Sequence, residues 1–220
     1  MSTRGKEKKA QKRKEKKKAE RKATANMPNL LNPIKAQEAL NKLFDHTRLT
    51  TPATLTDDVI RFCKKISETD PFYIQVEPEP WSRQSCCDMN VHEYIRINGG
   101  KIICGYRIWS HPPMYIEGER HALWFRDGVY KDISFSPDGE ERILFIPDIT
   151  EKQSALELNS DRIRWGKDNK TRQLIELQEH GESLRKVHRM SNEQAWSTML
   201  TYESWQNGQR MPNILIQPIS

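Results

Sequence analysis

The chain has 220 residues, of which 36 are Lys or Arg and 30 are Asp or Glu. This length suits one folded domain with appendages, and no run of about 18 apolar residues is present to predict a membrane-spanning helix. The N-terminus has no apolar segment typical of a signal peptide, and adjacent Cys86 and Cys87 are poor candidates for a structural disulfide, so we expect a cytoplasmic protein.

The positive charge is concentrated at the N-terminus. Residues 1–25 contain 12 Lys and Arg but only three acidic residues, so this segment has a formal charge of +9 and the rest of the chain −3. The segment consists mostly of good helix formers, but it has too few apolar residues for a helix to bury one face. The composition of residues 1–26 therefore predicts a disordered or fluctuating helical tail.

Two interpretations of this tail fit its composition. It is either an electrostatic anchor for RNA, DNA or a ribosome, because clustered cations displace counterions from phosphates, or a solubilising tail without a fixed partner. The cations that would make the nucleic-acid contacts are Lys8, Lys9, Lys12, Arg13, Lys14, Lys16, Lys17 and Lys18.

The next segment predicts two helices and a strand. A linker rich in Pro and Asn, residues 27–33, precedes helical spacing from Ile34 to about Phe44. Thr56 predicts the start of a second helix, whose apolar stripe places Cys63 in the core. Aromatic and β-branched residues at 72–76 then indicate a strand.

The centre of the chain predicts one helix followed by an antiparallel meander of about four strands. The helix begins at Cys87, runs to about Ile97 and is ended by Gly99-Gly100, where the backbone needs a positive φ. Period-two alternation and turn residues mark the strands. The expected strands are 101–109, 114–125, 129–134 and 142–146, with turns at Asp127-Gly128 and Asp138-Gly139.

After Pro147 the pattern is helical again, with helices expected over 170–186 and 192–205. Residues 211–218 would cap the domain or add an edge strand. The sequence therefore predicts an α+β core over residues 27–150 and a C-terminal helical extension over 151–220 that packs on it.

Three side chains in the core could form a nucleophilic site. Exposed N–H groups and the dipole at a helix N-terminus favour a thiolate, and Cys87 lies where the loop 81–86 meets its helix. A base and a group that orients the base must lie nearby. His121 and Asp132 are 11 positions apart across the expected hairpin, so they can face each other.

This region resembles a known superfamily. His121-Ala-Leu-Trp124 and Asp132-Ile-Ser134 resemble the His-strand and Asp-strand of transglutaminase-like, papain-fold cysteine enzymes. More closely, about 50 residues resemble a bacterial and phage family with the pattern Cys-x-x-Asn-Val, Gly-Gly, Gly-(aromatic)-x-(aliphatic)-Trp, Glu-x-Glu-x-His-Ala-x-Trp and Asp-Ile-Thr-Pro. Matching positions are Cys87, Asn90, Val91, Gly99, Gly100, Gly105, Trp109, Glu117, Glu119, His121, Ala122, Trp124, Asp132 and Ile133. The chain departs from the pattern at Ser110, where the family has an acid, and at Ser134-Phe135, which stands for Thr-Pro.

The resemblance implies a papain-like or transglutaminase-like core. Cys87 would be the nucleophile, His121 the general base and acid, and Asp132 the residue that orients the imidazole. The reaction would be hydrolysis, deamidation or transfer at an amide- or peptide-type substrate through a thioester on Cys87, with no cofactor. An oxyanion would be stabilised by Asn90 or by backbone N–H groups near Cys87, and Trp81 or Trp109 would wall the acyl site.

Several alternatives accompany this hypothesis. Cys86 is the rival nucleophile. Glu117 and Glu119 alternate with His121 along one strand, so they either form a carboxylate-rich pocket for a cationic or amide substrate or are solvated. Alternatively, Cys87, His121 and Asp132 are structural, and the protein is a non-catalytic module docked through its basic tail.

Zinc is a further alternative, because the chain has thiols and imidazoles in the same region. However, the sequence has no Cys-x-x-Cys or His-Glu-x-x-His pair, and adjacent cysteines seldom both bind one zinc, so no metal is expected. The side chains in question are Cys86, Cys87, Cys104, His92, His111 and His121.

Overall fold

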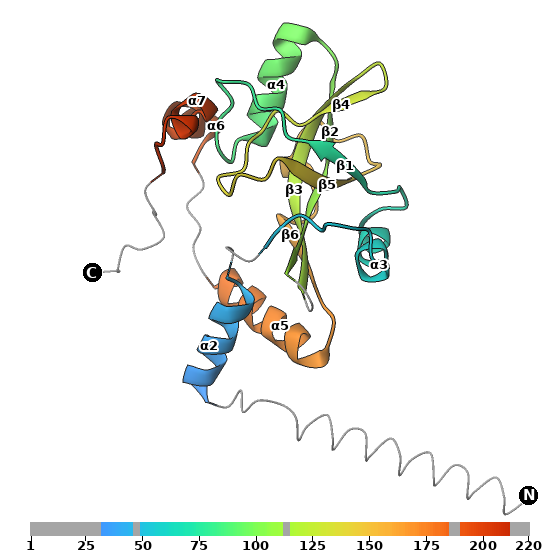
Figure 1. Cartoon of the computed structure of the whole chain (residues 1–220), viewed down its shortest axis with the longest axis vertical. Helices are drawn as coiled ribbons and strands as arrows, with labels where there is room; N and C mark the ends of the chain where they lie inside the picture. Colours follow the sequence, from blue (N-terminus) through green and yellow to red (C-terminus); the bar gives the residue numbers. More distant parts are fainter. Residues whose placement is uncertain (1–31, 46–48, 112–114, 185–189, 212–220) are drawn as a thin grey trace, which may run out of the picture.

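The computed structural model describes residues 32–45, 49–111, 115–184 and 190–211, which form a mixed α+β fold around one antiparallel sheet (Figure 1). The basic tail and residues 212–220 lie outside these ranges. Within them, no helix has the length and apolar character needed to cross a membrane. The elements are α2 (Pro33–Leu43), α3 (Asp57–Ile66), β1 (Phe72–Gln75), α4 (Cys87–Asn98), β2 (Lys101–His111), β3 (Tyr115–Arg126), β4 (Val129–Lys131), β5 (Arg142–Pro147), η2 (Ala155–Glu157), β6 (Arg162–Gly166), α5 (Asn169–Ser183), α6 (Asn192–Thr198) and α7 (Tyr202–Gln206).

The long hairpin of β2 and β3 forms the centre of the sheet. The strand order is β1-β5-β2-β3-β4, and β6 pairs with β3 beyond the reach of β4. On that edge β3 pairs with β6 through Tyr115–Glu119 and with β4 through Trp124–Arg126. Residues 120–123 therefore lie between the two partner strands, and this is where His121 is placed.

The sheet curls until its first strand meets its last. Val76, which follows β1, forms a parallel bridge with Asp132, and the Glu77 N–H donates to the Asp132 carbonyl at 2.7 Å. The rings of Phe72 and Tyr130 also meet, with centroids 4.9 Å apart. The curl fixes the position of Asp132 from two sides, through β4 and through the end of β1.

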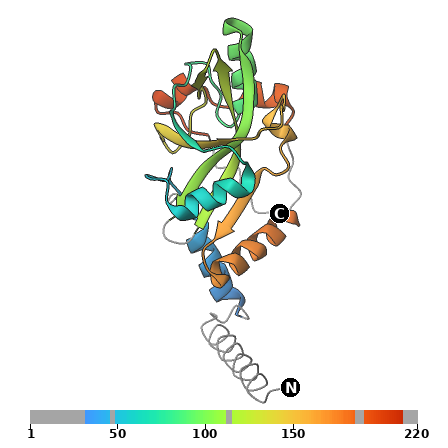
Figure 2. The same ribbon diagram turned by 90° about the vertical axis from the view of Figure 1, so that its right-hand side faces the viewer.

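Helices α3 and α4 pack against the sheet to form the main core. Buried Phe62 and Cys63 of α3 and Val91 of α4 belong to the same cluster as Cys104 and Ala122 of the hairpin. Figures 1 and 2 show α4 near one end of the long hairpin, whereas α2 and α5 pack together at the other end.

The local elements follow from their sequence signals. The Thr56 side chain accepts a hydrogen bond from the Val59 N–H and caps α3. Gly99 ends α4 with φ +68°, and the β3–β4 turn places Asp127 and Gly128 at φ +51° and +83°. The last two values are typical of a tight hairpin turn.

The predicted meander is wrong in its strand order. β5 lies between β1 and β2 instead of following β4, because it returns along the opposite edge of the hairpin. The third predicted strand is also shorter: β4 ends at Lys131, and the Asp132 carboxylate accepts from the Ser134 N–H at 3.0 Å, which turns the chain away.

The prediction that residues 151–220 form a purely helical extension is wrong. This region contributes β6 to the sheet, and the helix predicted over 192–205 is two short helices, with Thr201 capping the second. The sequence did not predict β6, in which Arg162 and Arg164 alternate with Ile163 and Trp165 and lie opposite Glu119 and Glu117 of β3. Charge pairs between the two strands stabilise the pairing of β6 with β3.

Candidate active site

Cys87 is the first residue of α4 and opens onto a cavity of about 1080 Å³ that His121 also lines. The residue is half-buried, and the N–H groups of the first turn of a helix have no partner within the helix, so they remain available to an anion. Ser85, two residues earlier, has φ +57° and lines the same cavity. The backbone thus turns sharply just before the thiol.

The two adjacent thiols, Cys86 and Cys87, differ in how deeply they are buried. Cys86 is only 4% exposed, and its burial raises its pKa to about 11. Burial likewise raises the pKa of Cys63 and of Cys104 to about 12. Cys87 is the least buried of the four free cysteines, and a sulfur must be reachable and ionisable to act as a nucleophile.

His121 is held by the carboxylate of Asp132. Its Nε2 donates to Asp132 Oδ2 at 3.1 Å, and both side chains are buried. The second carboxylate oxygen, Oδ1, accepts from the Ser134 N–H. The edge of the Phe145 ring lies against the imidazole, with centroids 6.3 Å apart, so the ring orientation is fixed by a carboxylate and by packing.

The surroundings of His121 favour its protonated form. Burial alone would lower its pKa, but the Asp132 carboxylate and then the Cys87 sulfur outweigh burial and raise the pKa well above its usual range. The imidazole thus bonds to the carboxylate and lines the same cavity as Cys87. The structure therefore brings together the three side chains that the sequence assigned to chemistry.

Asn90 is not in the cavity. It is fully buried, its Oδ1 accepts from the Arg83 N–H at 2.7 Å, and its Nδ2 donates to the Arg83 carbonyl at 2.9 Å and to Ser134 Oγ at 3.1 Å. Because these bonds use the whole amide group, Asn90 joins the loop before Cys87 to the loop after Asp132. The expected contact between Asn90 and an oxyanion does not fit this placement.

Trp81 and Trp109 are likewise not in the cavity wall. Trp81 packs on the main core and on Trp196, with ring centroids 6.4 Å apart. Trp109 is buried, and its indole N–H donates to Glu119 at 2.9 Å. The apolar part of the wall comes from other side chains, namely Met89, Phe135, Pro137, Leu156, Met190, Ala195 and Met199.

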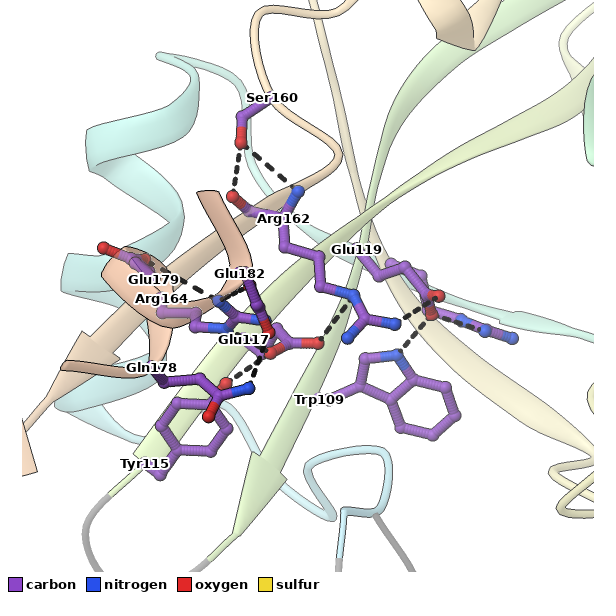
Figure 3. A network of polar contacts seen from close by, with 11 residues as sticks. Trp109, Tyr115, Glu117, Glu119, Ser160, Arg162, Arg164, Gln178, Glu179 and Glu182 are labelled. Atoms are coloured by element: carbon purple, nitrogen blue, oxygen red, sulfur yellow. Dashed lines mark hydrogen bonds and ion pairs between the residues drawn. The ribbon is translucent and has the colours of Figure 1, made fainter. Parts of the chain in front are cut away.

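Glu117 and Glu119 form neither a free carboxylate pocket nor a solvated pair. Arg164 Nε donates to Glu117 at 2.9 Å (Figure 3), and Arg107 Nη2 donates to Glu119 at 2.7 Å. Burial would raise the pKa of Glu119, but the Arg107 guanidinium lowers it to about 2. Each carboxylate is thus paired with an arginine, and the low pKa of Glu119 keeps that side chain ionised.

The arginines of this network were not identified as site residues from the sequence. Arg107 comes from β2, and Arg162 and Arg164 come from β6; all three line the cavity. Alternation of Arg with apolar residues in Arg162–Gly166 was the available signal, since it matches the alternation of Glu117 and Glu119. In the described part of the chain, no three His, Cys, Asp or Glu side chains group as metal ligands.

Comparisons with protein-family models, with curated proteins and with solved structures found no match to this chain.

Proposed function

We propose that the protein is a cysteine-nucleophile enzyme that hydrolyses, deamidates or transfers an amide- or peptide-type acyl group through a thioester on Cys87. The observation that carries the proposal is the placement of one imidazole, His121: it lines the same cavity as Cys87, and its Nε2 bonds to Asp132 at 3.1 Å. A buried imidazole between a reachable thiol and a carboxylate is the arrangement that activates a nucleophile.

Each side chain of the site has its own role in the proposed reaction. His121 takes the Cys87 proton, and the thiolate attacks the carbonyl carbon, forming a C–S bond. The negative oxygen is stabilised by first-turn N–H groups of α4, and His121 then protonates the departing amine as the C–N bond breaks. Water or an amine then attacks the thioester carbonyl while His121 accepts its proton, the C–S bond breaks, and the proton passes to the sulfur, which regenerates the thiol. Asp132 keeps the imidazole oriented and stabilises its positive charge.

The fold supports a finer proposal, a papain-like or transglutaminase-like core. Its basis is a helix with a cysteine at its first residue beside an antiparallel sheet that carries His121 and supports Asp132. The four cysteines are free, which suits a reducing compartment such as the cytoplasm.

Alkylation by iodoacetamide tests the proposal without a known substrate. At pH 7 we expect rapid modification of one sulfur in the wild type and its loss in Cys87→Ala. Cys86→Ala and Cys104→Ala serve as matched controls and should keep the rapid phase, since both thiols are buried. A rapid phase that survives in Cys87→Ala, or that disappears in Cys86→Ala with Cys87 present, would contradict the assignment.

A second proposal concerns the basic tail, which lies outside the described residues. We propose that residues 1–25, with 12 Lys and Arg against three acids, anchor the protein to RNA, DNA or a ribosome. Deleting residues 1–25 should then abolish salt-dependent binding to a mixed-sequence RNA while leaving Cys87 alkylation unchanged. Binding that persists after the deletion would favour a purely solubilising tail.

A further inference from the structure

The cavity beside Cys87 has two walls of different chemistry. One part of the lining is apolar, with Phe135, Leu156 and Met199 among its side chains. Another part is charged and comes from β2, β3, β6 and α5 (Figure 3). A substrate that fills both parts must offer a polar or charged group to the second wall.

Most of the carboxylates of the charged wall already accept short hydrogen bonds. Glu119 accepts from Arg107 at 2.7 Å and from the Trp109 indole. Glu182 of α5 accepts two bonds from Arg164, at 2.7 and 3.0 Å. Glu117, beneath them, accepts from Arg164 and from the Tyr115 hydroxyl.

Two charged groups of this wall are held loosely. Glu179 lies 3.9 Å from Arg164, with 48% of its side chain exposed. Arg162 lies 3.5 Å from Glu117 and 3.8 Å from Glu119, and both distances exceed those of normal N–H···O bonds. A guanidinium has five N–H donors in a planar fork, so Arg162 has donors to offer a planar acceptor such as a carboxylate.

Arg162 and His121 are diagonal neighbours across β6 and β3. In the β3–β6 register Arg162 lies opposite Glu119, and His121 is two residues further along β3. The backbone positions of such diagonal neighbours are about 7–8 Å apart, and both residues line the cavity that Cys87 also lines. With 38% of its side chain exposed, Arg162 can move toward a ligand, whereas Arg164 is 97% covered and fixed.

We propose that Arg162 binds a carboxylate of the substrate, so that the enzyme selects amides that also carry a carboxylate. An acidic peptide is the substrate class that this describes. The inference rests on the proposed function, because it assumes that Cys87 is the reacting atom. The two carboxylates nearest Arg162 are each paired with another arginine, Glu119 with Arg107 at 2.7 Å and Glu117 with Arg164 at 2.9 Å, which reduces their repulsion of such a ligand.

A pair of alkylating probes tests the inference. N-iodoacetyl-β-alanine carries a carboxylate, and N-iodoacetyl-β-alaninamide replaces it with a neutral amide of nearly the same size. In both reactions the Cys87 thiolate forms a C–S bond and displaces iodide. We expect the carboxylate probe to react about tenfold faster in the wild type, as one charge-assisted contact of about 1.4 kcal/mol would give.

Variants of two arginines test whether Arg162 causes the difference in rate between the two probes. Arg162→Gln should reduce the ratio of the two rates to near one, and Arg162→Lys should restore part of it. Arg120→Gln is the matched control: Arg120 lines the same cavity but pairs with Asp161 at 2.6 Å, so the ratio should persist. The ratio is taken within each variant, which cancels any change in thiol reactivity.

The outcomes separate this inference from the proposed function. Equal rates for the two probes in the wild type, or a ratio unaffected by Arg162→Gln, would overturn the role of Arg162 while leaving Cys87 as nucleophile. If neither probe modified Cys87 faster than it modifies a cysteine in the urea-unfolded protein, the proposed function itself would fall, and this inference with it.

Discussion

The side-chain amide of Asn90 donates a hydrogen bond to Ser134 Oγ at 3.1 Å, and this contact joins the two halves of the site. Asn90 lies on the first turn of α4, three residues after Cys87. The Ser134 N–H in turn donates to Asp132 Oδ1 at 3.0 Å. The thiol and the carboxylate that orients its partner are therefore held by one buried network.

Removing the Asn90 amide should disturb both halves. In Asn90→Ala the Arg83 N–H loses its acceptor and the Arg83 C=O keeps only the Cys86 N–H at 3.3 Å, which we expect to cost about 2 kcal/mol of unfolding free energy. Urea unfolding measures the loss. Asn98→Ala is the control on the same helix, because Asn98 is exposed, and it should change stability by less than about 0.5 kcal/mol.

The coupling of Asn90 to Ser134 can be measured directly. Ser134→Ala and Asn90→Ala share one hydrogen bond, so their stability losses should not add. We expect the double variant to lose at least about 0.5 kcal/mol less than the sum of the single losses. Additive losses would mean that the 3.1 Å contact contributes nothing in solution.

Asp132→Asn should make Cys87 alkylation depend more strongly on pH. Without the carboxylate, the pKa of His121 falls, and the imidazolium that stabilises a thiolate is less populated. We expect iodoacetamide to react about tenfold more slowly than with wild type at pH 6, with a smaller loss at pH 9, where a thiol ionises without help. An equal loss at both values would argue against electrostatic activation.

Protonation of His121 should stabilise the folded state. Its pKa lies above the unfolded value of about 6.5, so the contribution is complete below pH 6.5 and is lost as pH rises through the raised pKa. The stability difference between wild type and His121→Gln should shrink by about 1.4 kcal/mol per pH unit across that window. Urea unfolding at pH 6, 7.5 and 9 tests this, and a constant difference would contradict it.

Gly105→Ala should be destabilising because β5 passes close to β2 there. A Cβ at position 105 would lie 2.2 Å from the Ile146 carbonyl oxygen and 2.6 Å from the Phe145 ring, which packs on His121. We expect a loss of about 3 kcal/mol together with slower Cys87 alkylation.

Gly181→Ala is the control for the glycine substitution. No atom lies within 4 Å of a Cβ there, and the residue is inside α5, so alanine should stabilise by about 0.5–1 kcal/mol. Similar stability in Gly105→Ala and wild type would mean that β5 can shift away from β2.

The sequence by itself determined the local elements around the site. Thr56 caps α3, Gly99 ends α4 and Asp127-Gly128 forms the hairpin turn, because each signal acts within a few residues of the backbone that it shapes. The same locality placed Cys87 at a helix N-terminus and put His121 and Asp132 on either side of one turn. These relations needed no knowledge of distant contacts.

The groups that the site residues contact depend on the tertiary structure. Burial distinguishes Cys86 from Cys87, the Arg83 backbone occupies the Asn90 amide, and β6, more than 40 residues further along the chain than Glu117, supplies Arg164, which pairs with that carboxylate. Burial and long-range pairing depend on how the sheet curls and which strands meet, and those contacts join residues that no local pattern relates.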